Sequence, residues 1–325
     1  MWTHAQANTS SVQNKIAAAR FRAKALSDIR AFFLKRDVLE VETPLLSRDA
    51  SHDFHIDLFS VPTENSVRFL QTSPEPHMKR LLARGYPDIF QISKAFRMGE
   101  SGKKHNPEFT MLEWYRLGFT LSEMIEEAVE LCQLVTGVAG RLPTEFVSYG
   151  DAFSKATGFD PFSSHRDQLV EHPAFAGRGL KTGDFPEGSD ALNFLMSEVV
   201  EPALNPSFLT VIHSFPLMLS SQALPDPANP LASLRFEIFG DGMELGNGYQ
   251  ELRDITEYHR RFEAENQRRE SAGKPVPPLD EGWFRDVTPE LPACSGVAIG
   301  LDRLILMGLN TDRLEDLLEF SWEKS

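Results

Sequence analysis

The stretch of sequence that decides the fold spans residues 96–115 and reads FRMGESGKKHNPEFTMLEWY. It predicts a strand, a polar loop and a second strand, because side chains alternate in character on either side of a loop rich in Gly, Lys and Asn. Arg97 falls on one face of the first arm, and Phe109, Glu113 and Tyr115 share one face of the second. If the arms pair antiparallel, an arginine, an aromatic ring and a carboxylate meet on one surface. Those groups can hold a nucleotide triphosphate beside a cationic substrate.

Composition limits the class of protein. At 325 residues and 41% hydrophobic content, the chain can bury one large core with an insertion rather than two equal domains. No apolar run approaches the roughly 20 residues of a membrane span, and the N-terminus lacks a signal-peptide pattern, so a cytoplasmic enzyme is expected. Cys132 and Cys294 lie too far apart in sequence to suggest a disulfide framework or a zinc site. The net charge of −14 argues against a large nucleic-acid surface.

The order of predicted elements favours an α+β fold, because strands and helices segregate rather than alternate as βαβ units. Helices are predicted over residues 12–36, 121–138 and 255–269, and from Leu301 onward. Strands are predicted over residues 38–42, 234–252 and 295–300, and residues 272–286 read as a proline-rich connector. Residues 142–230 are expected to form an irregular insertion, because Pro, Gly, Asp and Ser are frequent there.

Residues 235–244, RFEIFGDGME, predict a hairpin with a two-residue turn at Gly240-Asp241. That turn would place Glu237 directly opposite Glu244, and like charges opposed on a sheet are unfavourable. A cation between them would relieve the repulsion, and Mg²⁺ carrying phosphates is the natural candidate. The alternative is a pair of solvated surface glutamates.

Residues 296–303, GVAIGLDR, place Gly296, Ala298 and Gly300 at period two. Small side chains make one face of the strand nearly flat, so a bulky ligand could lie against the backbone. Arg303 follows in the first helical turn and could reach an anionic or aromatic part of that ligand. The alternative is close helix–strand packing with Arg303 as a surface charge.

Taken together, these segments resemble the three motifs of the class II aminoacyl-tRNA synthetases, specifically of the lysyl branch. Glu42-Thr43-Pro44 resembles the end of motif 1, residues 96–113 resemble motif 2, and residues 300–303 resemble motif 3. The resemblance runs from about residue 15 to the C-terminus and implies an antiparallel sheet flanked by helices. The short segment before motif 1 and the run MLEWYR at residues 111–116 are similar to the elongation factor P–(R)-β-lysine ligases, truncated relatives without an anticodon-binding domain.

This resemblance implies ATP-dependent activation of (R)-β-lysine, and of lysine less well, to an adenylate. The acyl group would then pass to the ε-amine of a lysine on elongation factor P, with release of AMP. ATP and Mg²⁺ are the implied cofactors, and a homodimer through the motif 1 helix is expected. Neither a membrane nor tRNA is expected as a partner.

The resemblance also implies roles for individual residues. Arg97 and Arg303 would be catalytic, Arg97 gripping the α-phosphate and the carboxylate and Arg303 reaching the γ-phosphate. ATP would contact Arg97, Met98, Gly99, His105, Asn106, Phe109, Glu244, Leu245, Gly300 and Arg303. The substrate would contact Ser73, Pro74, Glu75, Tyr115, Asn247, Glu251 and Ala298, and the metal Glu237 and Glu244. Phe109 would stack on adenine, Glu75 would take the amine near the reacting end, and Tyr115 with Glu251 the distal ammonium.

Two positions depart from the lysyl synthetases. Gly99 stands where they usually carry the motif 2 glutamate, and Glu100 follows it. Ala298 stands where they usually carry glycine. One methyl group is worth roughly 1–3 kcal/mol of discrimination, so Ala298 could favour the shifted amine of β-lysine.

Two other functions fit the motifs in part. One is a minimal lysyl-adenylate-forming enzyme that acts on tRNA or another acceptor, which the acidic charge disfavours. The other is a non-catalytic synthetase-like regulator. The retained Arg97, Glu237, Glu244 and Arg303 disfavour it, because a regulator does not need the phosphate and metal apparatus.

Overall fold

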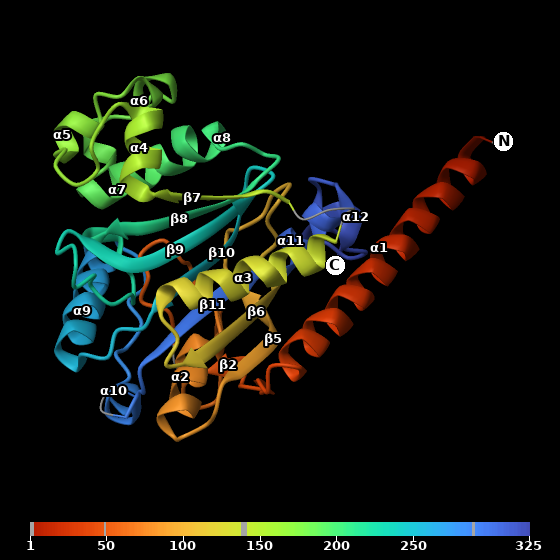
Figure 1. Ribbon diagram of the computed structural model, residues 1–325, viewed down its shortest axis with the longest axis horizontal. Coiled ribbons are helices and arrows are strands. Elements are labelled where there is room, and N and C mark those ends of the chain that lie inside the picture. The colour runs from red at the N-terminus through yellow and green to blue at the C-terminus, as the bar shows by residue number, and fades with distance from the viewer. Residues whose placement is uncertain (1–2, 49, 138–141, 288–289) are drawn as a thin grey trace. The chain divides into compact units, whose positions relative to one another are not determined.

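The computed structural model describes residues 3–48, 50–137, 142–287 and 290–325. The chain forms two compact units (Figure 1). Unit 1 consists of residues 1–119, 130–141 and 253–325, and unit 2 of residues 120–129 and 142–252. No helix in the described part of the chain is long and apolar enough to cross a membrane. The assignment of the whole chain to a single catalytic domain stays a prediction.

Unit 1 is built on a sheet whose strands follow the order β1-β5-β6-β11. These strands are β1 (Leu39–Glu40), β5 (Ile89–Phe96), β6 (Glu108–Leu117) and β11 (Cys294–Gly300). The β5–β6 and β6–β11 pairs are antiparallel, and β1 runs parallel to β5. A smaller sheet has the order β2-β4-β3, with β2 (Leu46–Ser47), β3 (Ser60–Pro62) and β4 (Val67–Leu70). The predicted strand–loop–strand arrangement is confirmed.

The helices of unit 1 range from about one to nine turns in length. They are α1 (Thr3–Leu34), α2 (Glu75–Ala83), α9 (Ile255–Ser271), α10 (Glu281–Val287), α11 (Leu301–Leu309), α12 (Leu314–Leu317) and the 3-10 turn η4 (Trp322–Lys324). α3 (Leu121–Thr136) connects β6 to the next unit. Phe33 of α1 stacks on Phe90 of β5 at 4.4 Å and meets Trp114 of β6 edge-on at 5.3 Å, which anchors the helix to the sheet.

Three sequence expectations for unit 1 change in detail. The first helix is longer than predicted, and the strand expected over residues 38–42 is only two residues long. The connector over residues 272–286 contains most of helix α10, so it is not wholly irregular. The helix predicted over residues 121–138 ends at residue 138, which lies outside the described residues.

Unit 2 is built on a sheet with the order β10-β9-β8-β7. The strands are β7 (Thr144–Ser148), β8 (Leu209–Pro216), β9 (Ala232–Gly240) and β10 (Met243–Gln250). β8–β9 and β9–β10 are antiparallel, whereas β7 runs parallel to β8. Both units therefore combine a mostly antiparallel sheet with helices, and the predicted α+β class is confirmed.

The hairpin between β9 and β10 turns one residue later than predicted. Asp241 and Gly242 both have positive φ, 50° and 64°, so the turn is Asp-Gly, which suits such a backbone. Gly240 pairs with Met243 and Phe239 with Glu244; a bulge at Leu245 then sets Glu237 opposite Asn247. The predicted direct pairing of Glu237 with Glu244 is wrong. Moving the turn by one residue shifts the partner of Glu237 by two residues, and the bulge, an extra residue in β10, shifts it by one more, from Glu244 to Asn247.

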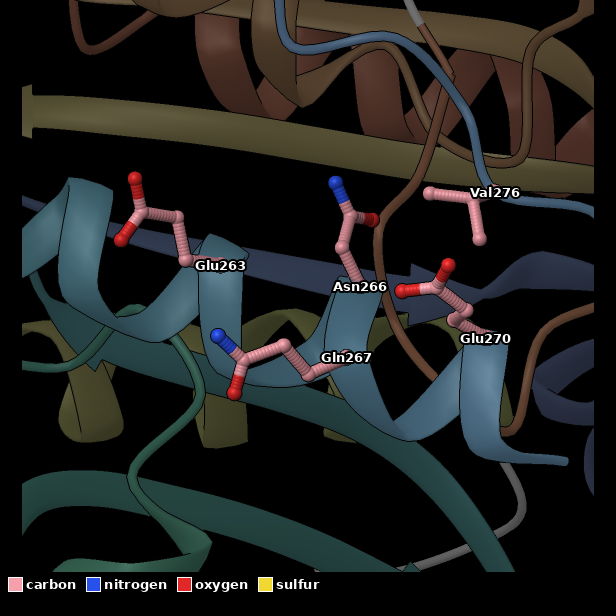
Figure 2. A pocket seen from close by; sticks show the side chains of 5 residues that line it. All are labelled: Glu263, Asn266, Gln267, Glu270 and Val276. Carbon is pink, nitrogen blue, oxygen red and sulfur yellow. The ribbon is translucent and has the colours of Figure 1, made fainter.

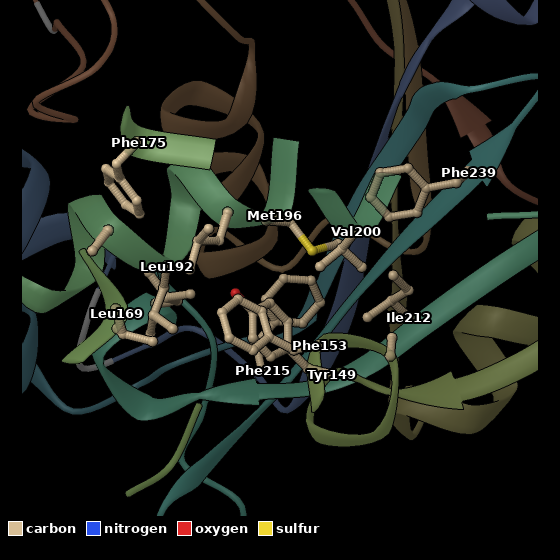
Figure 3. Packing of buried hydrophobic residues seen from close by; sticks show 14 residues of the cluster. Tyr149, Phe153, Leu169, Phe175, Leu192, Met196, Val200, Ile212, Phe215 and Phe239 are labelled. Carbon is tan, nitrogen blue, oxygen red and sulfur yellow. The ribbon is translucent and has the colours of Figure 1, made fainter. Parts of the chain in front are cut away.

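The segment expected to be irregular forms short helices with a core of their own. They are α4 (Tyr149–Thr157), α5 (Arg166–Leu169), α6 (Pro173–Gly177), η1 (Thr182–Asp184), α7 (Gly188–Leu195), the π-helical turn η2 (Met196–Val200), α8 (Glu201–Ala203) and η3 (Leu217–Leu219). Figure 3 shows Phe153, Leu192 and Phe215 packed together in this core. The prediction of irregular structure over residues 142–230 is wrong, because Pro and Gly there separate short helices rather than prevent them.

The two cysteines are both buried and unbridged. Burial raises the pKa of the Cys132 thiol to about 12. Neither thiol is therefore an available nucleophile.

Candidate active site

Strands β5, β6 and β11 present one continuous face in unit 1. Tyr115 and Glu113 of β6 lie opposite Gly296 and Ala298 of β11, and Gly300 pairs with Met111. Residues directly opposed on a sheet point to the same side. The flat face predicted for β11 therefore lies directly beside the carboxylate and phenol of β6, and the same face continues across β5 through the Ala95–Phe109 pair.

A carboxylate cluster, made of Ser73, Glu75, Glu113 and Tyr115, stands on this face. Tyr115 Oη donates to Glu113 Oε1 and Ser73 Oγ donates to Glu113 Oε2, each at 2.8 Å. Ser73 Oγ also accepts from the Glu75 backbone N–H at 3.0 Å. Pro74 is the N-cap of α2, so the Ser-Pro-Glu segment delivers Glu75 in the first turn of that helix. The predicted substrate residues of unit 1 are thus brought together.

The ionised form of Glu113 is disfavoured in this setting. Burial raises the pKa of Glu113, and the nearby Glu75 carboxylate raises it further. The hydrogen bonds from Tyr115 and Ser73 and the charge of Lys79 act in the opposite direction. A carboxylate so placed gains strongly from a cation that arrives beside it.

The motif 2 loop brings its charged residues to the end of β5. The Arg97 guanidinium lies 5.1 Å from the Phe109 ring centre, and its Nη1 lies 3.8 Å from Glu100 Oε1. Gly99 has a φ of 84°, a backbone conformation that favours glycine. The turn at Gly99 places the Glu100 carboxylate beside Arg97, and the half-exposed Met98 precedes it. The carboxylate displaced by one residue in the sequence therefore still reaches the motif 2 arginine.

Motif 3 meets the same loop. Arg303 Nη2 donates to His105 Nε2 at 2.5 Å, so two predicted ATP residues are in contact. Asn106 donates from Nδ2 to the Glu108 carbonyl at 2.6 Å, and its Oδ1 accepts from the Trp322 backbone N–H at 2.9 Å.

Asp302 fixes the start of α11, on which Arg303 lies. It is buried, pairs with Arg22 of α1 at 2.5 Å and accepts from the Thr110 backbone N–H at 2.7 Å. Arg22 also donates to Thr110 Oγ1 at 2.6 Å. One carboxylate thereby joins motif 3 to the motif 1 helix and to β6.

Unit 2 contains the predicted metal carboxylates. Glu237 is buried and accepts from Arg235 Nη2 at 2.5 Å. Burial raises the pKa of Glu237, Arg235 opposes the rise, and the carboxylates of Glu244 and Glu201 add to it. Glu244 therefore lies within electrostatic reach of Glu237 despite the changed register. No cluster of three or more His, Cys, Asp or Glu side chains with metal-binding geometry occurs among the described residues.

The remaining predicted residues of unit 2 lie along β10 and just after it. Leu245 is the bulge residue and is buried. Asn247 accepts from Arg235 Nε at 3.3 Å and faces Glu237 across the strands. Glu251 is buried and bridges to Ala223 through a single backbone pair. Convergence of the unit 1 and unit 2 residues on one nucleotide stays a prediction.

Sequence reasoning placed Glu113 on the correct face but did not assign it to the site. Gln91 was missed as well: it pairs with Glu113 across β5 and β6, is buried, and its Oε1 has no hydrogen-bond partner in the part of the chain that the structure describes. A buried acceptor without a donor is costly, so this oxygen is suited to a donor on a ligand. The sequence does contain a signal for Gln91: it shares one strand face with Ser93 and Ala95, because the three residues are spaced two apart.

A surface hollow of about 480 Å³ lies elsewhere in unit 1 (Figure 2). Four of its lining residues project from α9 and Val276 comes from the following connector. The full lining is Glu263, Asn266, Gln267, Glu270 and Val276. It contains none of the predicted site residues.

Comparison with known proteins shows the family of this chain. Residues 4–324 match the family described as tRNA synthetases class II (D, K and N). The chain belongs to this family. Because the match covers motifs 1, 2 and 3 and both units, the family assignment made from the sequence is confirmed.

Individual relatives are similar over nearly their whole length. A protein of Haemophilus ducreyi is 40% identical, covering 98% of this chain and 96% of the relative. One of Haemophilus influenzae strain PittGG is 39% identical, covering 92% and 93%, and one of Avibacterium paragallinarum is 37% identical, covering 100% of both. Each of the three is named Elongation factor P–(R)-beta-lysine ligase.

Proposed function

We propose that this protein is an ATP-dependent, AMP-forming ligase. It activates (R)-β-lysine, and α-lysine less well, and transfers the acyl group to the ε-amine of a lysine on elongation factor P. The end-to-end similarity to three relatives of that name carries the proposal. The buried carboxylate cluster supports it independently, because two carboxylates and a phenol beside a flat strand suit an amino acid with two amines.

The carboxylate cluster would bind the substrate's charges. Glu75 takes the amine nearest the reacting carboxylate, and Glu113, Tyr115 and Glu251 take the distal ammonium. A buried ammonium needs paired charge and hydrogen bonds, which these groups supply. Asn247 adds a polar contact to the substrate.

The first step would be attack of the substrate's carboxylate oxygen on the α-phosphorus of ATP. The bond to the bridging oxygen breaks and pyrophosphate leaves. Arg97 binds both the carboxylate and the α-phosphate, so it brings the reacting groups together and offsets charge in the transition state. Phe109 stacks on adenine, while Arg303 and His105 hold the distal phosphates. No side-chain nucleophile is required.

Glu237 and Glu244 fit a magnesium site. Mg²⁺ is commonly held by one or two carboxylates together with substrate phosphates, and here the Glu244 carboxylate raises the pKa of Glu237. When bound, Mg²⁺ would neutralise charge on the phosphates. Leu245 and Gly300 would line the nucleotide through their backbones.

In the second step the neutral ε-amine of the acceptor lysine would attack the acyl carbon, and AMP would leave. The attacking nitrogen loses one proton to solvent, and the new bond is an amide. The protein would work as a homodimer in the cytoplasm.

The proposal is tested by two assays on the purified protein. Pyrophosphate exchange with (R)-β-lysine and with α-lysine should show a higher kcat/KM for the β-isomer, and Arg97→Ala should abolish exchange. Labelled (R)-β-lysine should then mark elongation factor P and leave tRNA unlabelled. Absence of exchange with either isomer would favour the regulator, and labelling of tRNA alone would favour the minimal synthetase.

A further inference from the structure

Lys79 is a charged residue at the carboxylate cluster to which the proposed function gives no task. It lies one turn beyond Glu75 on α2, and its side chain is completely buried. Its Nζ donates to Glu75 Oε1 at 2.6 Å and to Tyr258 Oη at 3.3 Å. A lysine is rarely buried this fully without a specific partner, so the pair with Glu75 requires an explanation.

Stability alone is a weak explanation. Taking an ammonium and a carboxylate out of water is costly, and an apolar pair of similar volume often serves a fold equally well. The neighbours are suitable for such a replacement, since Met78 and Leu82 of the same helix are buried. The ion pair therefore points to a use for the charge itself.

The charges of the carboxylate cluster indicate what the buried charge of Lys79 does. The Glu75 carboxylate raises the pKa of Glu113, whereas the charge of Lys79 lowers it. The ion pair engages Oε1 of Glu75 and leaves Oε2, on a side chain that is 17% exposed, to accept from an incoming amine. The i,i+4 spacing, with glutamate on the N-terminal side, is the favourable orientation for such a pair.

We propose that Lys79 is a positioning residue: it orients the Glu75 carboxylate by one oxygen, so that the other oxygen receives the substrate amine nearest the reacting carboxylate. The inference rests on the proposed function. Lys79 does not touch the substrate in this arrangement. It sets the affinity for one of the two amines and leaves the nucleotide site unaffected.

The test compares Lys79→Met and Lys79→Arg with Arg80→Met in pyrophosphate exchange. Arg80 is a matched control, because it lies on the same helix and pairs with Asp280 at 2.8 Å, away from the cluster. Lys79→Met should raise KM for (R)-β-lysine about 10- to 100-fold, the range for losing one hydrogen bond to a charged group, with KM for ATP unchanged. Lys79→Arg should recover part of the loss, and Arg80→Met should leave KM unchanged.

Two further measurements separate positioning from general damage. 6-Aminohexanoate keeps the distal ammonium and the carboxylate but lacks the near amine, so it should inhibit wild type and Lys79→Met equally. In a Glu75→Gln background, Lys79→Met should add little to KM, because the carboxylate it serves is gone. The neutral double variant also keeps the comparison open if Lys79→Met alone does not fold.

Three results would overturn the inference: an unchanged KM in Lys79→Met, an equal loss of affinity for 6-aminohexanoate and β-lysine, or additive effects in the double variant. The proposed function fails separately, since wild-type protein would then show no exchange with either lysine isomer.

Discussion

Unit 1 and unit 2 each contain a buried glutamate, Glu113 or Glu237, near a second glutamate and a cation, but they arrange these groups differently. In unit 1 the cation, Lys79, pairs with Glu75, and Glu113 accepts hydrogen bonds from the hydroxyl groups of Tyr115 and Ser73. In unit 2 the cation, Arg235, pairs with Glu237 directly and also contacts Asn247. The compact ammonium of Lys79 contacts one oxygen of Glu75, whereas the planar guanidinium of Arg235 reaches both Glu237 and Asn247.

The difference indicates which kind of cation the carboxylates of each unit can bind. In unit 1 Glu113 is surrounded by hydroxyl donors and a flat strand, which suits an organic ammonium that needs directed hydrogen bonds. In unit 2 Glu237 has acidic neighbours, Glu244 and Glu201, which suits a compact divalent ion. In both units the neighbouring carboxylates outnumber the one cation, Lys79 or Arg235, that lies among them. The following predictions test this contrast.

The largest effect is expected for Glu113→Gln. Removing one partner of a buried charge pair typically costs about 3–5 kcal/mol, so kcat/KM for (R)-β-lysine should fall by roughly 200- to 5,000-fold. KM for ATP should stay the same in pyrophosphate exchange. Glu108→Gln is the control, because Glu108 pairs with Lys94 at the surface of β6. A parallel rise in KM for ATP would show that Glu113 does not serve the amino acid specifically.

Glu237→Gln should act on the metal instead. Losing one of two carboxylate ligands should raise the Mg²⁺ concentration for half-maximal exchange by roughly tenfold or more. KM for (R)-β-lysine at saturating Mg²⁺ should change little. Glu145→Gln, an exposed carboxylate on β7, is the control. If Glu237→Gln altered only the amino-acid KM, the two units would not differ in the way described.

Substrate binding should release a proton from Glu113. Its pKa is raised in the unliganded protein, and an arriving ammonium favours the ionised form, so the pKa falls on binding. Affinity for (R)-β-lysine should therefore rise with pH, by up to about tenfold per pH unit, from the ordinary carboxylic range until the raised pKa is passed, and then level off. Calorimetry in two buffers of different ionisation enthalpy measures this proton. Glu113→Gln should show none, and an unchanged proton count in that variant would assign the proton to another group.

Ala298→Gly should give the smallest change. Ala298 lies opposite Glu113, so its methyl group stands on the face that would hold the substrate backbone. Removing it should raise α-lysine activation about fivefold, near the lower end of what one methylene discriminates. Exchange rates that stay the same for both isomers would refute a selective role for this methyl group.

The residues that were predicted correctly share a local signal. Period-two alternation placed Phe109, Glu113 and Tyr115 on one face and made β11 flat beside them, because strand faces depend only on spacing along the chain. The three motifs are also short local patterns, and they were sufficient to predict the family.

The errors come from choices that the local sequence leaves open. Gly240-Asp241-Gly242 permits two different two-residue turns, and the pairing of Gly240 with Met243 selects the second of them. Short helices in unit 2 owe their stability to a shared core, which no window of sequence reveals. The contact between Ser73 and Glu113 joins segments 40 residues apart. Lys79 did carry a local signal, its spacing of four from Glu75.

The burial of both thiols has a practical consequence. Chemical labelling reagents react with thiolates that solvent can reach, and Cys132 and Cys294 offer none. A single cysteine introduced on the surface would thus be the one site for maleimide dyes or photoactivatable cross-linkers. Scanning such a probe across exposed positions would map where an acceptor protein approaches, without first removing any native residue.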